Sequence, residues 1–525
     1  MSGSAAPVPN RTLITLSVML GNLMQSLDAS IANVSLPYMQ GSLSTTADEI
    51  TWVLTSYVIA AAIMTAPVGW MAHRFGRRNL HVTCMAGFVL ASMLCGMAAN
   101  LEEMVCFRFL QGMFGAALVP LSQATMLDIY PFEKRPQVMA IFGMGVMVGP
   151  IIGPTLGGYL TEIFSWRAVF YVNVPFGIVA VTGLLMFLPR VLPRSDLRFD
   201  WIGFGVLATA VAAFQLMLDR GQGQDWFNSP EIIAEAVLAA LGLYLFVVHM
   251  FTAKAPFLPP GLFRDRNFVC GVSMVFCTAT VMLASSALMA PYLENLAGYP
   301  VEQAGLAMAP RGVGTIIGMQ LASRIAGRVD HRKVMAFGLL VMGVSLYSMS
   351  YWTPDVDRAT IMLTLLVQGS SIGFVFNPMT VMAFTTLPAN LRSYSTSLQS
   401  LCRSLGQALG VSVTSVMFVR NIQVSHADIA AGITPFNRVL QGQDAIQSAW
   451  GPASRHGVML LDQVVNHQAQ IIAFNNDYRL LSLVVIPPLF LLLLMRAHVV
   501  RAPTPATTPA PPPVAAPARA AATAD

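Results

Sequence analysis

The chain has 525 residues, of which 55% are apolar and only 10% are charged, and its net charge is +5. Soluble domains carry about 25% charged residues, so this composition excludes a water-facing globular surface and indicates a chain surrounded by lipid. No lysine-rich face with interleaved aromatic residues is present, which argues against nucleic-acid binding.

Apolar windows follow one another along most of the chain. A helix needs roughly 20 apolar residues to cross about 30 Å of hydrocarbon. Fourteen windows meet this requirement, and the tenth and thirteenth are the weakest because they contain Arg311 and Arg403. The sequence therefore predicts transmembrane helices over residues 13–39, 51–72, 80–99, 104–129, 137–161, 167–189, 200–219, 231–252, 267–293, 302–323, 334–353, 359–385, 395–419 and 477–497.

The basic residues between these windows predict the orientation. Lysine and arginine gather in the short cytoplasmic loops of membrane proteins. About 20 of the 30 basic residues lie on one side, in alternate loops such as the one with Arg74, Arg77 and Arg78 and at the two ends of the chain, whereas the opposite loops are acidic or nearly uncharged. We therefore expect a multi-pass protein of the inner membrane with both termini in the cytoplasm.

Two ionisable residues lie inside predicted spans at similar depth, Asp28 in the first and Arg108 in the fourth. A charge inside a span costs about 2.5–3.5 kcal/mol on insertion scales and usually marks function. Two interpretations stay open: a site that loads and releases a proton, and a static ion pair that joins two helices. Polar residues that flank the pair favour the proton site and are also substrate-binding candidates: Asn22, Gln25, Asn33 and Gln111.

A third ionisable residue, Arg311, follows Pro310 near the middle of the tenth window. Contact with a substrate and pairing with an acidic residue of the protein are equally compatible with this position. Gln368 and Asn377, which lie inside the twelfth window, complete the substrate-binding candidates chosen by position.

Small residues recur at every fourth position of the fifth window. Such spacing lets two helix backbones approach closely. We expect either a tight seam that prevents ions from leaking between bundles, or ordinary helix packing. The motif consists of Gly145, Gly149, Pro150, Gly153 and Gly157.

Taken together, these motifs resemble the fourteen-span drug:proton antiporters of the major facilitator superfamily, of the EmrB and QacA type, and most strongly the EmrB-like branch. The segments from Leu27 to Pro37, from Arg108 to Gly112 and from Gly145 to Gly158 are similar to motifs of the first, fourth and fifth spans. Trp166-Arg167 and the segment from Asn173 to Gly177 complete the pattern. The loop after the second span is similar to the gating loop of the superfamily, with Gly69, His73, Arg74, Gly76, Arg77 and Arg78.

This loop departs from the family pattern at one position. His73 occupies the place where the motif usually has an aspartate. We therefore expect the loop arginines to depend on Asp128 to hold the inward side closed.

The resemblance implies an all-α polytopic membrane protein with the major facilitator fold, two six-helix bundles and two inserted helices. A degenerate echo of the gating loop at 327–333 supports an internal repeat. We expect five parts: a cytoplasmic N-terminus (1–12), the first bundle (13–189), a linker with two inserted helices (190–252), the second bundle with a periplasmic loop at 420–476 (253–500), and a disordered tail (501–525). Helical spacing at Val458 and Leu461 predicts an interfacial helix or a docking surface in that loop.

The function implied by the resemblance is proton-coupled export of small amphipathic or toxic compounds, with multidrug efflux and antibiotic resistance as its outcome. The alternative is a specific metabolite or siderophore exporter on the same scaffold. Relatives of the EmrB type work with a periplasmic adaptor and an outer-membrane channel, which implies the same partners here. The sequence has no phosphate-binding loop, no catalytic motif and no metal spacing, so we expect neither an enzyme nor a cofactor.

Overall fold

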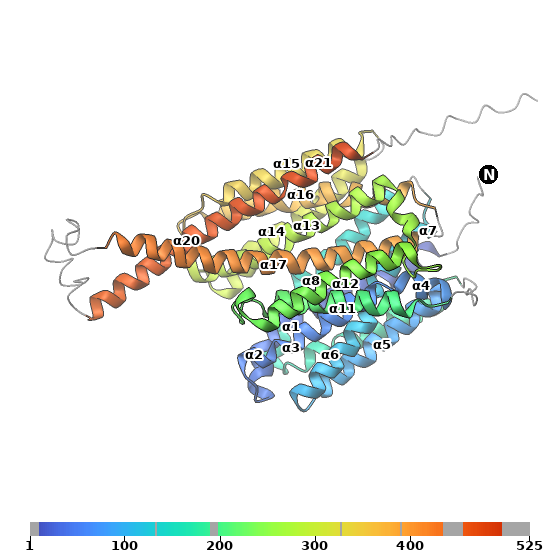
Figure 1. The fold of residues 1–525 in the computed structure, drawn as a ribbon, viewed down its shortest axis with the longest axis horizontal. Coiled ribbons are helices and arrows are strands. Elements are labelled where there is room, and N and C mark those ends of the chain that lie inside the picture. The colour runs from blue at the N-terminus through green and yellow to red at the C-terminus, as the bar shows by residue number, and fades with distance from the viewer. Residues whose placement is uncertain are drawn as a thin grey trace, which may run out of the picture.

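The structure is a computed structural model, and it describes residues 10–131, 134–189, 198–325, 328–388, 391–433 and 455–495. These residues form helices and contain no strand. Most helices run side by side along the long axis of the molecule (Figure 1). Several predicted features lie outside the described residues: the tail at 501–525, the start of the chain at 1–9, residues 190–197 of the linker, and 434–454 of the predicted loop.

The helices of the first half cover the first six predicted windows. Breaks within a window divide some of them into two pieces, as in the pair α3 and α4, which is bent by 55°. The elements are α1 (Arg11–Ser42), α2 (Ala47–Ile50), α3 (Trp52–Thr65), α4 (Val68–Arg74), α5 (Arg77–Met97), α6 (Leu101–Gly115), α7 (Leu118–Ile129), α8 (Arg135–Ile163), α9 (Ala168–Tyr171) and α10 (Asn173–Phe187).

The remaining helices cover the two inserted windows and the second half. The inserted pair is α11 (Trp201–Arg220) and α12 (Pro230–Thr252), with the short turn η2 (Trp226–Asn228) between them. The second half contains η3 (Pro260–Arg264), α13 (Arg266–Pro291), the π-helical turn η4 (Tyr292–Leu296), α14 (Val301–Ile325), α15 (His331–Met349), α16 (Arg358–Thr385), α17 (Arg392–Ala431), α20 (Arg455–Val484) and α21 (Ile486–Leu494).

Not every helix is apolar enough to be recognised as a membrane span. Within the described residues, nine helices are long and apolar enough to cross a bilayer, or ten if the bent pair α3 and α4 counts as one span. The predicted total of fourteen is therefore not confirmed. The helices α1 and α17 have 32 and 40 residues but are not among the nine. The physical reason is that both carry polar residues on the face that lines the central cavity described below.

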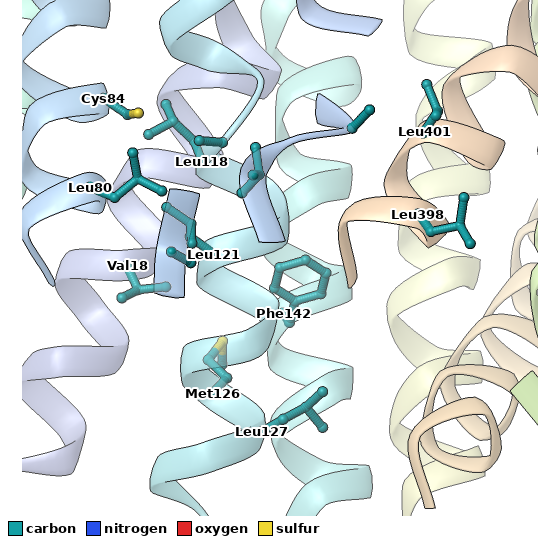
Figure 2. Packing of buried hydrophobic residues seen from close by; sticks show 14 of the residues in the cluster. Val18, Leu80, Cys84, Leu118, Leu121, Met126, Leu127, Phe142, Leu398 and Leu401 are labelled. Carbon is teal, nitrogen blue, oxygen red and sulfur yellow. The ribbon is translucent and has the colours of Figure 1, made fainter. Parts of the chain in front are cut away.

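Each half has its own apolar core. One cluster of buried side chains lies wholly in the helices from α13 to α21, and another joins the ends of α1, α3, α5 and α6. A third cluster joins the halves, because Leu398 and Leu401 of α17 belong to the same cluster as Leu121, Met126 and Phe142 of the first half (Figure 2). The inserted helix α11 packs against both α3 and α17.

The segment expected to be a periplasmic loop is largely helical. α17 continues to Ala431, and α20 begins at Arg455, so residues 420–431 and 455–476 belong to these two helices. Helix thus covers both ends of the segment expected at 420–476, in agreement with the helical spacing at Val458 and Leu461. The expected position of this segment outside the membrane, on the periplasmic side, stays a prediction. The two helices pack against each other, and this contact lets them continue beyond the rest of the bundle (Figure 1).

Candidate functional site

A buried ion pair joins α1 and α6. Nη1 of Arg108 lies 2.8 Å from Oδ2 of Asp28, and both side chains are 1% exposed. The two residues that the sequence places at similar depth therefore meet. The cost of taking both charges out of water is offset only when the pair is well aligned and its other polar atoms are bonded.

Neutral groups complete this arrangement. Oδ1 of Asp28 accepts hydrogen bonds from Nε2 of Gln111 at 2.8 Å and from Nδ2 of Asn173 at 2.9 Å. The guanidinium of Arg108 also donates to Oε1 of Gln111 at 2.7 Å and, through Nε, to the carbonyl oxygen of Val53 at 3.1 Å. Both carboxylate oxygens of Asp28 thus accept hydrogen bonds from side chains of other helices.

An aromatic ring packs against the cation of this pair. The Arg108 guanidinium carbon lies 4.3 Å from the centre of the Tyr57 ring. This is the geometry of a cation–π contact, which stabilises a desolvated cation by about 2 kcal/mol or more. Arg108 and Tyr57 line the large central cavity, whereas Asp28 lies behind them.

The cavity lies between the halves and has a volume of about 1060 Å³. Its wall contains side chains from α1, α3, α8, α11, α13, α14, α16 and α17. Both apolar groups, such as Met282 and Phe376, and polar groups line it. This volume is slightly above the roughly 300–1,000 Å³ typical of ligand pockets, so the cavity accommodates a small organic molecule.

Contacts between the halves close one end of the cavity, which we call the Arg77 end. Asp128, near the end of α7, is paired with Arg77 of α5 and with Arg392 of α17, whose Nη1 lies 2.7 Å from Oδ1. Nη2 of Arg77 also donates to Oγ of Ser393 at 3.1 Å. A carboxylate of the first half therefore binds a cation from each half.

His73 takes part in the same closure in a different way. Its ring stacks on Tyr394 of α17, with 5.0 Å between ring centres and 12° between planes. Its Nδ1 lies 2.8 Å from the carbonyl oxygen of Gly69, and a side chain on Gly69 would collide with the Tyr394 backbone. Arg74 lies in the last turn of α4, Gly76 has a positive φ of 84°, and Arg78 donates to the carbonyl of Leu185.

The cavity extends to the opposite end of the bundle, which we call the α20 end because α17 and α20 project there (Figure 1). α11 begins next to α4, where Nε1 of Trp70 donates to the Arg198 carbonyl at 3.2 Å. The C-terminal end of α11 therefore lies at the α20 end. Gln222, two residues after this helix, lines the cavity.

The structure brings some of the substrate-binding candidates together and separates others. Asn22, Gln25, Asn33 and Arg311 line the cavity. The other three candidates do not, because their side chains bond within the helix packing behind its wall: Gln111 to Asp28, Gln368 to Ser285 and Asn377 to the Met319 carbonyl.

The glycine motif of α8 faces α1. A Cβ at Gly149 would lie 2.2 Å from Oγ of Ser26, and one at Gly153 would lie 2.5 Å from Cβ of Ser30. Gly145 and Gly157 also meet side chains of α1. These contacts lie inside the first half and agree with the alternative of ordinary helix packing. A role of the motif in preventing ion leakage between the bundles stays a prediction. The side chain of Pro150 lies outside the described residues.

Sequence reasoning missed several residues of this site. Tyr57 and Asn173 contact the ion pair. Asn173 was named only as part of a family motif, and Tyr57 carries no charge that would have identified it. Asp219 lines the cavity from the end of an inserted helix, where a carboxylate is expected at a membrane surface. Arg403 could have been chosen as a candidate from the sequence, because it interrupts an apolar window as Arg311 does. Among the described residues, no group of three His, Cys, Asp or Glu side chains is arranged to hold a metal ion.

Comparisons with known proteins agree with this architecture. The family profile described as Major Facilitator Superfamily matches residues 18–411. The chain is 33% identical over 482 residues to the probable multidrug resistance protein EmrY of Escherichia coli K12, covering 91% of this chain and 94% of that protein. It is 31% identical over 468 residues to the multidrug export protein EmrB of the same strain, covering 89% and 91%.

A solved structure supports the same fold. The human organic anion transporter MFSD10 aligns with a TM-score of 0.59 at 14% identity, covering 92% of this chain and all of that chain. At this level of identity the similarity concerns the fold alone.

Proposed function

The chain belongs to the major facilitator superfamily and is a multi-pass membrane transporter, and on this basis we propose that it is a proton-coupled antiporter that exports small amphipathic and toxic compounds by alternating access. Relatives of about the same length are named as multidrug export proteins, which supports multidrug efflux. The proton coupling rests on the ion pair between Asp28 and Arg108.

The position of this pair supports a role in coupling. Arg108 forms part of the cavity wall and Asp28 lies directly behind it. A ligand or water that draws Arg108 away leaves a carboxylate in an apolar environment, which favours protonation. Protonation of Asp28 in turn weakens its bond to Arg108. Proton and substrate thus act on the same arginine, which is the requirement for exchange.

The described conformation fits one state of an alternating-access cycle. The cavity is closed at the Arg77 end by Asp128 and extends to the α20 end. Basic residues gather at the Arg77 end, as at Arg74, Arg77 and Arg78, so we place this end in the cytoplasm together with both termini. The conformation is then outward-facing, and release of substrate occurs toward the periplasm.

The proposed setting is the inner membrane, with a periplasmic adaptor and an outer-membrane channel as further partners. The support is the projection formed by α17 and α20, which extends past the other helices at the proposed periplasmic end (Figure 1).

The proton gradient is sufficient for this work. One proton moved down 100 mV releases about 2.3 kcal/mol, and each pH unit adds about 1.4 kcal/mol. One proton per cycle therefore supports a substrate gradient of more than tenfold.

The test is drug transport in inverted membrane vesicles with simultaneous measurement of internal pH, comparing the wild type with Asp28→Asn. We expect several unrelated amphipathic compounds to drive proton movement in the wild type, and this movement to vanish in the variant. Asp225→Asn, which makes the same change in an exposed turn away from the ion pair, is the matched control. Proton movement that persists in Asp28→Asn would refute the assignment of the proton site.

A further inference from the structure

Three arginines line the cavity, and they differ in charge compensation. Arg108 is paired with Asp28 at 2.8 Å. In the described part of the chain, neither Arg311 nor Arg403 forms an ion pair. The same wall thus holds one guanidinium that the protein neutralises and two that it does not.

Arg311 is buried among neutral acceptors. Its side chain belongs to α14, and the residue is 9% exposed. It donates hydrogen bonds to Oγ of Ser286, to Oγ of Ser285 at 3.0 Å and to the carbonyl oxygen of Met282 at 2.9 Å. These contacts use three of the five N–H groups of the guanidinium and do not neutralise its charge.

Neighbouring residues hold Arg311 in place. Nε2 of Gln368 donates to Oγ of Ser285 at 3.3 Å, and the Tyr478 hydroxyl donates to the Ser285 carbonyl at 3.2 Å. On the backbone side, a Cβ at Gly369 would lie 1.9 Å from the carbonyl oxygen of Arg311. Only a glycine at this position permits so close an approach of α16, so the arginine is anchored from two sides.

Arg403 adds a second uncompensated charge from another helix. It lies on α17, lines the same cavity, and its Nη2 has a long contact of 3.4 Å with Oγ of Ser400. A contact of this length holds a guanidinium weakly, so Arg403 is free to adjust its position toward a bound molecule.

The acidic residues of the cavity do not neutralise these arginines. Asp219, at the end of α11, accepts a hydrogen bond from Oγ1 of Thr55 at 2.6 Å, and Glu294 belongs to η4. Both line the cavity near the α20 end, where α11 and α13 finish. Arg311, by contrast, lies ten residues into α14, about 15 Å along the helix from that end.

A cation removed from water without an opposite charge raises the free energy of the empty site. A ligand that brings a negative charge removes this cost and forms charge-assisted hydrogen bonds. The surrounding Met282, Met308 and Phe376 provide contacts for an apolar body. The positive charge of the site and its apolar wall together suit a molecule with an anionic group at one end of an apolar body.

We propose that the cavity binds small amphipathic anions, with a carboxylate on Arg311 and a second positive charge contributed by Arg403. This inference rests on the proposed export function and deepens it by naming the charge class of the substrates. Arg311 contacts the anion directly, and Ser285, Gln368 and Tyr478 position it.

The test is equilibrium binding of two radiolabelled ligands of equal chain length, octanoate and octyltrimethylammonium, to the full-length protein in nanodiscs at neutral pH. We expect the wild type to bind octanoate at least about tenfold more tightly than the cation. Arg311→Gln should weaken octanoate binding by about tenfold or more, because one or two charge-assisted hydrogen bonds are lost. The same change should not weaken binding of octyltrimethylammonium.

Variants separate a charge effect from misfolding. Arg311→Lys should retain part of the octanoate affinity, and Arg403→Gln should lose less than Arg311→Gln. Arg264→Gln, which removes a positive charge from the exposed end of η3, should leave the affinity for both ligands unchanged. Equal binding of both ligands by the wild type, or octanoate binding unchanged in Arg311→Gln, would overturn the proposal.

The two proposals fail in different ways. Proton movement driven by cationic drugs, without octanoate binding, would leave the antiport intact and overturn the anion site. Octanoate binding that depends on Arg311, without any substrate-linked proton movement, would support the anion site and overturn the proton coupling.

Discussion

Arg392 at the start of α17 donates a hydrogen bond to Asp128 near the end of α7, with 2.7 Å between Nη1 and Oδ1. This contact joins the second half of the chain to the first. Arg77 of the first half binds the same carboxylate. Asp128 therefore connects arginines of both halves, and its replacement removes both ion pairs.

Asp128→Asn should shift the protein away from the described conformation. The variant loses two partly exposed ion pairs, each worth about 0.2–1 kcal/mol, so we expect a change of roughly fivefold in the ratio of the two conformations. The measurement is thiol labelling of cysteines introduced at each end of the cavity. Asp225→Asn, in the exposed turn before η2, is the control, and equal labelling of Asp128→Asn and wild type would contradict the prediction.

His73→Ala should act in the same direction and more weakly. It removes the ring that stacks on Tyr394 across the two halves while leaving Asp128 and its arginines in place. Stacked aromatic pairs contribute about 0.5–1.5 kcal/mol beyond their buried area. The same labelling experiment measures this change, and His73→Phe, which keeps an aromatic ring, should behave like the wild type. A His73→Ala protein that favours the described conformation more strongly would show the idea to be wrong.

Arg108→Gln should destabilise the protein more than the double variant Asp28→Asn with Arg108→Gln. The single change leaves the buried Asp28 carboxylate without its cation, at a cost of about 3–5 kcal/mol. The second change converts that carboxylate to an amide and removes most of the cost. Thermal unfolding in detergent measures both, and a double variant less stable than Arg108→Gln would argue against a desolvated ion pair.

Gly149→Ala should destabilise the contact between α1 and α8. Its Cβ would lie 2.4 Å from the Ser26 backbone, which cannot move as a side-chain end can. Overpacking of this kind costs about 1–3 kcal/mol. Gly158→Ala on the same helix is the matched control, because no atom lies within 4 Å of its Cβ. Equal melting temperatures for the two variants would indicate that the helices separate more easily than the structure shows.

The second half contains a close approach of two helices that has no counterpart among the motifs named from the sequence. Gly369 on α16 contacts the Arg311 carbonyl of α14 as tightly as Gly149 contacts α1. Gly314 and Gly318 of α14, like Gly369 and Gly373 of α16, lie four residues apart, so the spacing that marks the seam of α8 is present here too, but it does not say which two helices meet. Their contact becomes visible only when the helices are packed.

The sequence by itself determined the class of the protein, the positions of most helices and the two residues of the central ion pair. These features depend on local quantities: the apolarity of about 20 consecutive residues and the cost of a charge inside such a run. Asp28, Arg108, Arg311 and Arg403 were all detectable on this ground.

Only the tertiary structure decided which arginine has a partner and which residues face the cavity. Arg108 meets Asp28 while Arg311 meets neutral serines, because compensation depends on which helices are neighbours. It also decided that residues 420–431 and 455–476 continue as helices. Their composition is too polar for a span, and the contact between α17 and α20 is a long-range interaction that no local pattern contains.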